Sequence, residues 1–350
     1  MSYVPRMATA QVIPLACPDL CGNERKYVNE CLDAGWLTHA GRFEHEFEAA
    51  FAKRFGADCI ATSSGTGALH LALLALGIAR GDEVIVPDLT FGATAAAVLA
   101  VGATPVFVDV SPETWGIDHR RIPDAITART KAIIPVHLYG EDAGDFREFG
   151  LPVIEDSCEA LGLVPLRGIV ACFSFYGNKI ITTGEGGMIA GNAELLSKAR
   201  AWRNGGFDSE YSHTVPGLNY RMTNIQAALG LAQIERLDYL LRRRLANVEA
   251  YKQALPGKGK WLFVATTKNP RTLAEHLAAN GIESRPVFTP LHRCPAFEQY
   301  AKGRFDVSDE IWRTGLALPT GPHVPVDDIK KITRLVNVNF DLRRTPDSRS

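Results

Sequence analysis

The sequence predicts an α/β protein with a mainly parallel central sheet flanked by helices, followed by a smaller C-terminal α+β domain. The first two-thirds of the chain alternates short apolar runs with helical patterns, which is typical of such a sheet. The runs are rich in β-branched residues and nearly continuously apolar, as strands buried on both faces are. With 350 residues, 46% of them hydrophobic, the chain exceeds one average domain and can fill a large core.

Seven strands and two helices are expected along the first part of the chain. A helix is expected at residues 66–76, where leucines recur on one face and Gly77 ends the pattern. A second helix is expected at residues 91–101. The expected strands comprise residues 59–62, 83–86, 105–108, 131–135, 152–155, 171–175 and 187–190.

A capping box opens a long helix in the middle of the chain. Thr223 stands at the N-cap and Gln226 follows three residues later. The helix is expected to continue to about Leu241 and to bridge to the small domain. We therefore predict a large domain at residues 1–235 and a small domain at residues 236–350.

The small domain is expected to mix strands and helices. Residues 261–266 and 282–287 have the composition of strands, and residues 272–279 have the pattern of a helix. The polar end, residues 343–350, is expected to fray.

Composition and charge exclude several classes of protein. The net charge of -1 gives no electrostatic footprint for nucleic acid. The basic run Arg242–Arg244 ends a helical pattern, and we interpret it as a solvated helix C-terminus. Seven irregularly spaced cysteines indicate free thiols in a reducing cytosol. Cys17 and Cys21 lack a second Cys/His pair, so we expect no zinc site and no other metal.

Neither a leader nor a membrane span is expected. Residues 1–22 lack a charged head followed by a long apolar stretch. The longest apolar run, residues 95–101, is far too short to cross a bilayer. We expect a cytoplasmic protein without membrane contact.

The most informative motif surrounds Lys179. It follows Ser174 by five residues and precedes the glycine-rich turn Thr182–Gly187. A lysine can form an imine with an aldehyde cofactor, and a serine can hold the phosphate of that cofactor. This arrangement predicts pyridoxal 5'-phosphate as cofactor. The alternative is an ordinary surface lysine, against which the surrounding glycines indicate a loop shaped for close approach.

A second motif, Ser63–Gly67, lies between an expected strand and an expected helix. The first amides of a helix point outward at its positive end, so a phosphate can dock there. The alternative is a tight connection without a ligand. The motif lacks both the spacing of a dinucleotide fingerprint and the end of a P-loop, which disfavours a Rossmann-type nucleotide enzyme.

Two further residues follow expected strands. Asp156 stands at the carboxyl end of the strand at 152–155, where α/β sheets bind ligands. Facing a pyridine nitrogen, its carboxylate would keep that nitrogen protonated. The alternative is a helix cap. Phe91 could stack on a flat cofactor ring, and its alternative is a core phenylalanine at a helix start.

Taken together, these motifs resemble the sugar-nucleotide aminotransferases of the DegT/DnrJ/EryC1/StrS type, within fold type I of pyridoxal phosphate enzymes. The similarity runs from about Gly22 to Val336. The stretches that carry it are residues 64–70, 87–91, 153–156, 173–188 and 217–226.

The resemblance implies roles for particular residues. Lys179 would carry the cofactor as an imine and move the proton during transfer. Asp156 would pair with the pyridine nitrogen, and Phe91 would stack on the ring. Glu159, where many relatives have glutamine, would lie near the ring oxygen. The implied phosphate contacts are Ser64, Gly65, Thr66 and Ser174 and, from the neighbouring subunit of a homodimer with shared active sites, Asn219.

The resemblance also implies a substrate. The sequence is most similar to one branch of the family at residues 173–188, at Glu159 and at residues 285–292. That branch converts GDP-4-keto-6-deoxymannose to GDP-perosamine for cell-surface polysaccharide. L-Glutamate would be the amino donor and 2-oxoglutarate the product. Candidate substrate contacts are Glu185, Arg285 and His292, although His292 could equally be structural.

Alternatives to this substrate and activity stay open. The substrate could be another keto sugar linked to UDP or dTDP, and the chain could be a catalytically silent relative that binds pyridoxal phosphate or a sugar nucleotide. The chain is also shorter than the family pattern between residues 139 and 151, between 162 and 171, and near Trp261. These losses fall outside the cofactor motifs.

Overall fold

The computed structural model describes residues 12–339. Two regions discussed above lie outside this part. They are residues 343–350, which were expected to fray, and residues 1–11, which belong to the region examined for a leader. The central sheet comprises β1 (Asp58–Thr62), β2 (Glu83–Pro87), β3 (Thr104–Val108), β4 (Thr130–Ile133), β5 (Ile154–Asp156), β6 (Val170–Ser174) and β7 (Gly187–Gly191). All seven predicted strands are thus confirmed, with ends shifted by at most two residues.

The seven strands follow the order β1-β7-β6-β5-β4-β2-β3. Strands β1, β7, β6 and β5 form one ladder and β3, β2 and β4 another. Isolated parallel bridges join the two, Ile133 to Val153 and Val136 to Asp156. Every strand pair is parallel except the two that β7 makes, with β1 and with β6. The predicted mainly parallel sheet is therefore confirmed.

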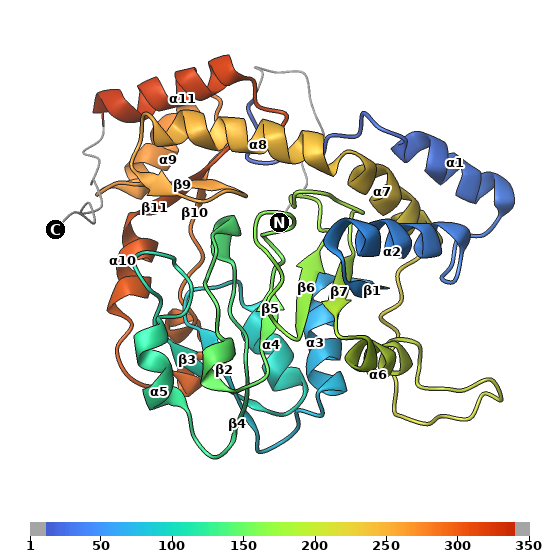
Figure 1. Ribbon diagram of the computed structural model, residues 1–350. Coiled ribbons are helices and arrows are strands. Elements are labelled where there is room, and N and C mark those ends of the chain that lie inside the picture. Colours follow the sequence, from blue (N-terminus) through green and yellow to red (C-terminus); the bar gives the residue numbers. More distant parts are fainter. Residues whose placement is uncertain (1–11, 340–350) are drawn as a thin grey trace.

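Helices cover both faces of this sheet (Figure 1). Side chains alternate along the strands: Phe173 packs in the cluster of α2 and α7, whereas its neighbour Cys172 packs in the cluster of α3 and α6. This alternation is the period of a strand buried on two sides. The helices are α1 (Glu24–Ala34), α2 (Arg42–Phe55), α3 (Gly65–Ala75), α4 (Ala93–Ala100), α5 (Ile122–Ala125), α6 (Ala193–Arg203) and α7 (Asn224–Glu235).

The connection between the parallel strands β4 and β5 carries no α-helix. Such crossovers usually contain one. Here the chain makes only two short 3₁₀ turns, Leu138–Gly140 and Arg147–Phe149. The buried side chains of Ala143 and Phe146 pack against the sheet instead. The absence of the usual helix at residues 139–151 is thus visible in the structure.

The predicted long bridging helix is two helices. The capping box is present, with Gln226 N donating to Thr223 Oγ1 at 3.3 Å and Thr223 N to Gln226 Oε1 at 2.9 Å. The helix ends at Glu235, and α8 (Leu237–Lys252) follows after Arg236, whose φ of -108° and ψ of 6° are not helical. Arg236 donates to Asp19 Oδ1 at 2.7 Å. Neither proline nor glycine marks this break, so the sequence did not reveal it.

The C-terminal part is an α+β unit with its own core. Its antiparallel sheet has the order β10-β11-β9-β8. Buried Tyr251 of α8 stacks on Phe263 of β9 at 5.0 Å between ring centroids. The predicted strand at 282–287 pairs with β11 at Arg285 and Pro286 and forms an isolated parallel bridge from Ile282 to Ile13. The division at residue 235 stays a prediction. The elements beyond α8 are β8 (Gly257–Lys258), β9 (Phe263–Thr266), α9 (Pro270–Ala279), β10 (Arg285–Pro286), α10 (Asp306–Thr314), β11 (Gly315–Leu318) and α11 (Val326–Asn339).

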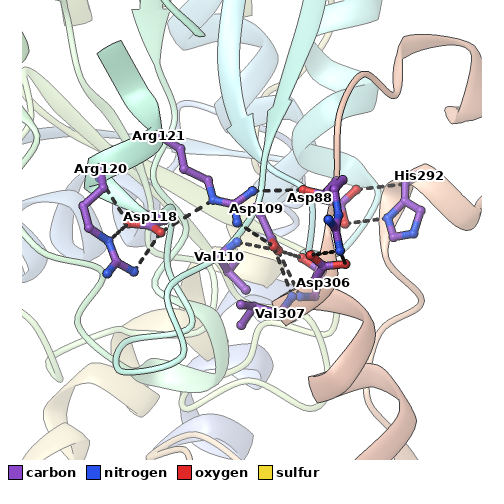
Figure 2. Close-up of polar contacts among 11 residues, drawn as sticks. Asp88, Asp109, Val110, Asp118, Arg120, Arg121, His292, Asp306 and Val307 are labelled. Carbon is purple, nitrogen blue, oxygen red and sulfur yellow. Dashed lines mark hydrogen bonds and ion pairs between the residues drawn. The ribbon is translucent and has the colours of Figure 1, made fainter. Parts of the chain in front are cut away.

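The residue that follows β3, Asp109, anchors α10 (Figure 2). Its buried carboxylate accepts hydrogen bonds from Val307 N at 3.1 Å, Ser308 N at 3.0 Å and Ser308 Oγ at 2.7 Å. The first amides of a helix lack intrahelical acceptors, so Asp109 supplies the N-terminal cap of α10 from a distant strand. Arg121 lies 3.8 Å from the same carboxylate.

Within residues 12–339, no helix combines the length and the apolar character that a membrane span requires.

Candidate active site

Lys179 lies just past β6, and Glu159 and Trp261 flank its amino group in what we call the lysine pocket. Its backbone N–H donates to Tyr176 O at 2.9 Å, which closes a tight turn. Only 14% of its side chain is exposed. The Nζ atom lies 3.4 Å from Glu159 Oε1 and 4.1 Å from the centroid of the Trp261 ring. Lys179 is therefore not an ordinary surface lysine.

Asp156 ends β5 and is buried beside this pocket. Its Oδ2 accepts a hydrogen bond from Thr94 Oγ1 at 2.8 Å, and its Oδ1 accepts one from Cys158 N at 3.2 Å. The two donors fix the orientation of the carboxylate and leave lone pairs on both oxygens. Such a carboxylate can hold a protonated ring nitrogen.

Glu159 faces Lys179 from the turn after β5. Its Oε2 accepts a hydrogen bond from Tyr139 N at 2.7 Å. Burial raises the pKa of the Glu159 carboxyl above its ordinary value, and the charge of Lys179 opposes this shift. The acid that replaces the family's glutamine is therefore in direct contact with the predicted catalytic lysine.

Helix α3 offers a cradle for a phosphate. Ser64 caps it, with Oγ accepting from Gly67 N at 3.0 Å, and Ala68 N donates to Ser64 O. This leaves the amides of Gly65 and Thr66 as the free donors of the first turn in the described chain. A Cβ at Gly65 would lie 2.8 Å from Ser174 Cβ and 2.9 Å from Cys158 Sγ, so glycine is required for this approach.

These groups fit pyridoxal 5'-phosphate. The α3 amides and Ser174 would hold its phosphate, Asp156 its ring nitrogen, and Lys179 its aldehyde carbon. Phe91 is 58% exposed and precedes α4, so it is not a core phenylalanine. Its ring lies 5.6 Å from that of Phe288, at the rim of the same region. A stacking role for Phe91 stays a prediction.

Within residues 12–339, three other predicted site residues make no hydrogen bond or ion pair with Lys179. Asn219 is exposed and bridges to Asn204 before α7. Glu185 is exposed, and its backbone oxygen accepts from Gln226 Nε2 at 2.8 Å. Arg285 lies 3.7 Å from Glu283. Their contacts with substrate or with a second subunit stay predictions.

His292 has carboxylates at both ring nitrogens. Nδ1 lies 2.7 Å from Asp88 Oδ2 and Nε2 lies 3.3 Å from Asp309 Oδ1. The ring stacks on Phe305 at 4.8 Å, and His292 N donates to Asp88 Oδ1 (Figure 2). Burial raises the pKa of Asp88, while the hydrogen bonds from His292 lower it. This geometry favours the structural interpretation of His292.

Four residues of the site were missed from the sequence. Thr94 follows Phe91 by three residues and orients Asp156, a role that spacing alone does not reveal. Cys158 lies under Gly65, and burial raises the pKa of its thiol well above the usual range. Tyr139 and Trp261 enter from segments far from the motifs, and no local pattern distinguishes them from core aromatics. In the described chain, no group of three or more potential ligands is arranged to hold a metal ion.

A buried lysine, a helix N-terminus and a carboxylate at a parallel strand end are the parts that an enzyme using pyridoxal 5'-phosphate requires. The model of the DegT/DnrJ/EryC1/StrS aminotransferase family matches residues 18–337. The chain belongs to this family, and the predicted fold class and cofactor are confirmed.

Two named relatives and one solved structure show which members of the family this chain is similar to. GDP-perosamine synthase of Caulobacter vibrioides is 44% identical, over 95% of this chain and 98% of the relative. GDP-perosamine synthase of Escherichia coli O157:H7 is 40% identical, over 93% and 98%. The crystal structure of DesV from S. venezuelae has a TM-score of 0.84 at 34% identity, covering 89% of this chain and 93% of DesV. The first alignment is 370 residues long, so that relative carries insertions, as the short segments of this chain predict.

Proposed function

We propose that this enzyme transfers the amino group of L-glutamate to GDP-4-keto-6-deoxymannose and so forms GDP-perosamine. The observation that carries the proposal is the pocket in which Lys179 meets Glu159 beside Asp156 and the start of α3. The substrate follows from the three GDP-perosamine synthases, which are 37–44% identical to this chain.

Each residue around Lys179 is proposed to have a distinct role in the transfer. Bound pyridoxal 5'-phosphate supplies an electron sink for breaking the C–H bond next to the transferred nitrogen. The amino group of Lys179 would take that proton and deliver it to the carbon on the other side of the transferred nitrogen. Because lysine and substrate are held together, this transfer is local rather than bimolecular. Asp156 would keep a positive charge on the ring nitrogen, and the positive end of α3 would hold the phosphate.

The enzyme is proposed to work as a homodimer with shared active sites. Asn219 and a set of exposed aromatic side chains support this, because a second copy would cover apolar surface. Four of the exposed aromatics in the described chain are Trp36, Tyr176, Phe207 and Tyr211. A cytoplasmic location is also proposed, and the seven unpaired cysteines support it.

A panel of keto-sugar nucleotides tests the substrate. The protein is incubated with pyridoxal 5'-phosphate, L-glutamate and 4-keto-6-deoxy sugars linked to GDP, UDP or dTDP, and the products are weighed by mass spectrometry. The amino sugar is expected from the GDP-linked substrate at the highest kcat/KM. Preferential amination of a UDP or dTDP sugar would contradict the assignment of the nucleotide.

The alternative hypothesis, a catalytically silent relative that only binds the cofactor, predicts a different absorbance change. An active enzyme shows a visible absorbance band with the cofactor, and this band bleaches when glutamate is added. A band that glutamate leaves unchanged would support a binding protein without transferase activity.

A further inference from the structure

Trp261 covers the amino group of Lys179. The tryptophan stands two residues before β9 in the C-terminal part of the chain and is 2% exposed. The 4.1 Å between Nζ and the ring centroid is within the range of a cation–π interaction. Such an interaction strengthens when water is excluded, and both side chains are largely buried here.

The indole is tied to the loop that carries the lysine. Its Nε1 donates to Asn178 O at 2.9 Å, and Asn178 directly precedes Lys179. The ring also stacks on that of Tyr139, with 6.2 Å between centroids and 16° between planes. These contacts fix the ring plane, so the indole cannot leave Nζ without breaking a hydrogen bond to the neighbouring residue.

Tyr139 connects the indole with the carboxylate on the other side of the lysine. Its N–H donates to Glu159 Oε2, and its carbonyl oxygen accepts from Trp261 N at 2.8 Å. Tyr139 adopts a left-handed conformation, with φ of 52°. This conformation is unfavourable in a residue other than glycine and persists only where the surroundings impose it. The constrained backbone of Tyr139 therefore positions both groups that flank Nζ, the indole of Trp261 and the carboxylate of Glu159.

We propose that Trp261 is a positioning residue for Lys179. Its indole face and the Glu159 carboxylate together define where the amino group rests when it is not bonded to the cofactor. The inference rests on the proposed function, in which Lys179 must be free to carry a proton. A fixed position raises the fraction of lysine conformers that can transfer the proton. Loss of the indole should therefore slow turnover more than it weakens substrate binding.

The first test measures the lysine itself, in the full-length protein without added cofactor. The protein is treated briefly with acetic anhydride at pH 7, and acetylation of Lys179 relative to exposed Lys198 is measured by mass spectrometry. Trp261→Leu is expected to raise this ratio about 2- to 30-fold, which corresponds to a cation–π energy of about 0.5–2 kcal/mol. Trp312→Leu is the control, because the indole of Trp312 lies over Arg293 instead.

Trp261→Phe keeps an aromatic ring but loses the bond to Asn178, so a smaller rise of the same ratio is expected. This variant decides the question if Trp261→Leu does not fold. A folded Trp261 variant with the wild-type ratio would overturn the proposal.

The second test separates positioning from simple packing. With cofactor and glutamate deuterated at the α-carbon, Trp261→Phe is expected to lower kcat and to increase the isotope effect while KM for glutamate stays within about twofold. An unchanged isotope effect would overturn the proposal. The labelling ratio does not depend on transamination, so a protein that labels as expected but does not aminate the keto sugar contradicts the proposed function alone.

Discussion

Two pairs of strand ends at the same edge of the sheet carry buried aspartates with different tasks. At β5 and β6, Asp156 faces the pocket of Lys179 and is oriented by Thr94 and Cys158, which are near it in the fold. At β2 and β3, Asp88 and Asp109 bind the segment around α10 instead (Figure 2). A carboxylate at the carboxyl end of a parallel strand is thus no sufficient sign of a ligand site. What decides is whether a later segment of the chain occupies it.

The largest expected effect concerns Lys179. Replacing it with alanine removes both the covalent anchor and the proton carrier, so turnover should fall at least about 1,000-fold. The substitution should change the melting temperature little, because the lysine side chain itself is not part of the hydrophobic clusters. Activity assays and thermal unfolding check this, with Lys198→Ala as the control on an exposed lysine. A Lys179→Ala enzyme with wild-type turnover would refute the catalytic role.

A reciprocal pair of variants tests the comparison directly. Asp156→Asn should lower turnover about 10- to 150-fold, as expected for losing a charged hydrogen bond of about 1.5–3 kcal/mol. Asp109→Asn should instead lower the free energy of unfolding by about 2 kcal/mol, because it weakens the cap of α10. Urea unfolding and kcat at 25 °C are measured for both. If Asp109→Asn impaired catalysis and left stability intact, the division between the two strand pairs would be wrong.

A variant of His292 tests whether Asp88, at the end of β2, has a structural role. Its ring joins Asp88 to Asp309, so His292→Ala should lower the free energy of unfolding by about 1–3 kcal/mol. KM for the sugar nucleotide should stay within about twofold. Stability and KM are measured together, with Arg285→Ala as a matched removal of a second candidate substrate contact. An increase of KM in a stable His292→Ala protein would restore the histidine to the substrate site.

The smallest expected effect is the pH dependence that Glu159 contributes. Because burial raises its pKa in the folded protein, protonated Glu159 favours folding at pH values below the unfolded pKa. This contribution is lost as the pH rises through the folded value. Glu159→Gln removes the titration, so its stability relative to wild type should increase as the pH rises above about 4.5. Unfolding of the cofactor-free protein at several pH values tests this, and a constant difference would contradict it.

Much of the architecture was predictable because it depends on local patterns. Continuous apolar runs revealed all seven strands of the sheet, and the Thr223–Gln226 box revealed the start of α7. The break at Arg236 was not predictable, because neither proline nor glycine marks it and the side chain bonds to Asp19, 217 residues earlier. The antiparallel direction of β7 likewise depends on pairing rather than composition.

The site shows the same limit. Lys179, Asp156 and the Ser64–Thr66 turn were recognisable because each lies in a motif whose chemistry is local. Trp261 and Tyr139 were not, since their roles arise only where the C-terminal part meets the loop of the lysine. His292 illustrates the converse: its sequence context permitted a substrate contact, and only the positions of Asp88 and Asp309 favour another role.

The contacts of Asp88 and Asp109 also bear on how the chain folds during synthesis. Their partners, His292 and Ser308, are 204 and 199 residues further along. At a translation rate of about 5–20 residues per second, the ribosome needs about 10–40 s to supply them. Until then both acids are hydrated and β3 lacks its covering segment. The nascent N-terminal sheet is therefore open to chaperones, and a chain truncated before residue 292 would keep that vulnerable state permanently.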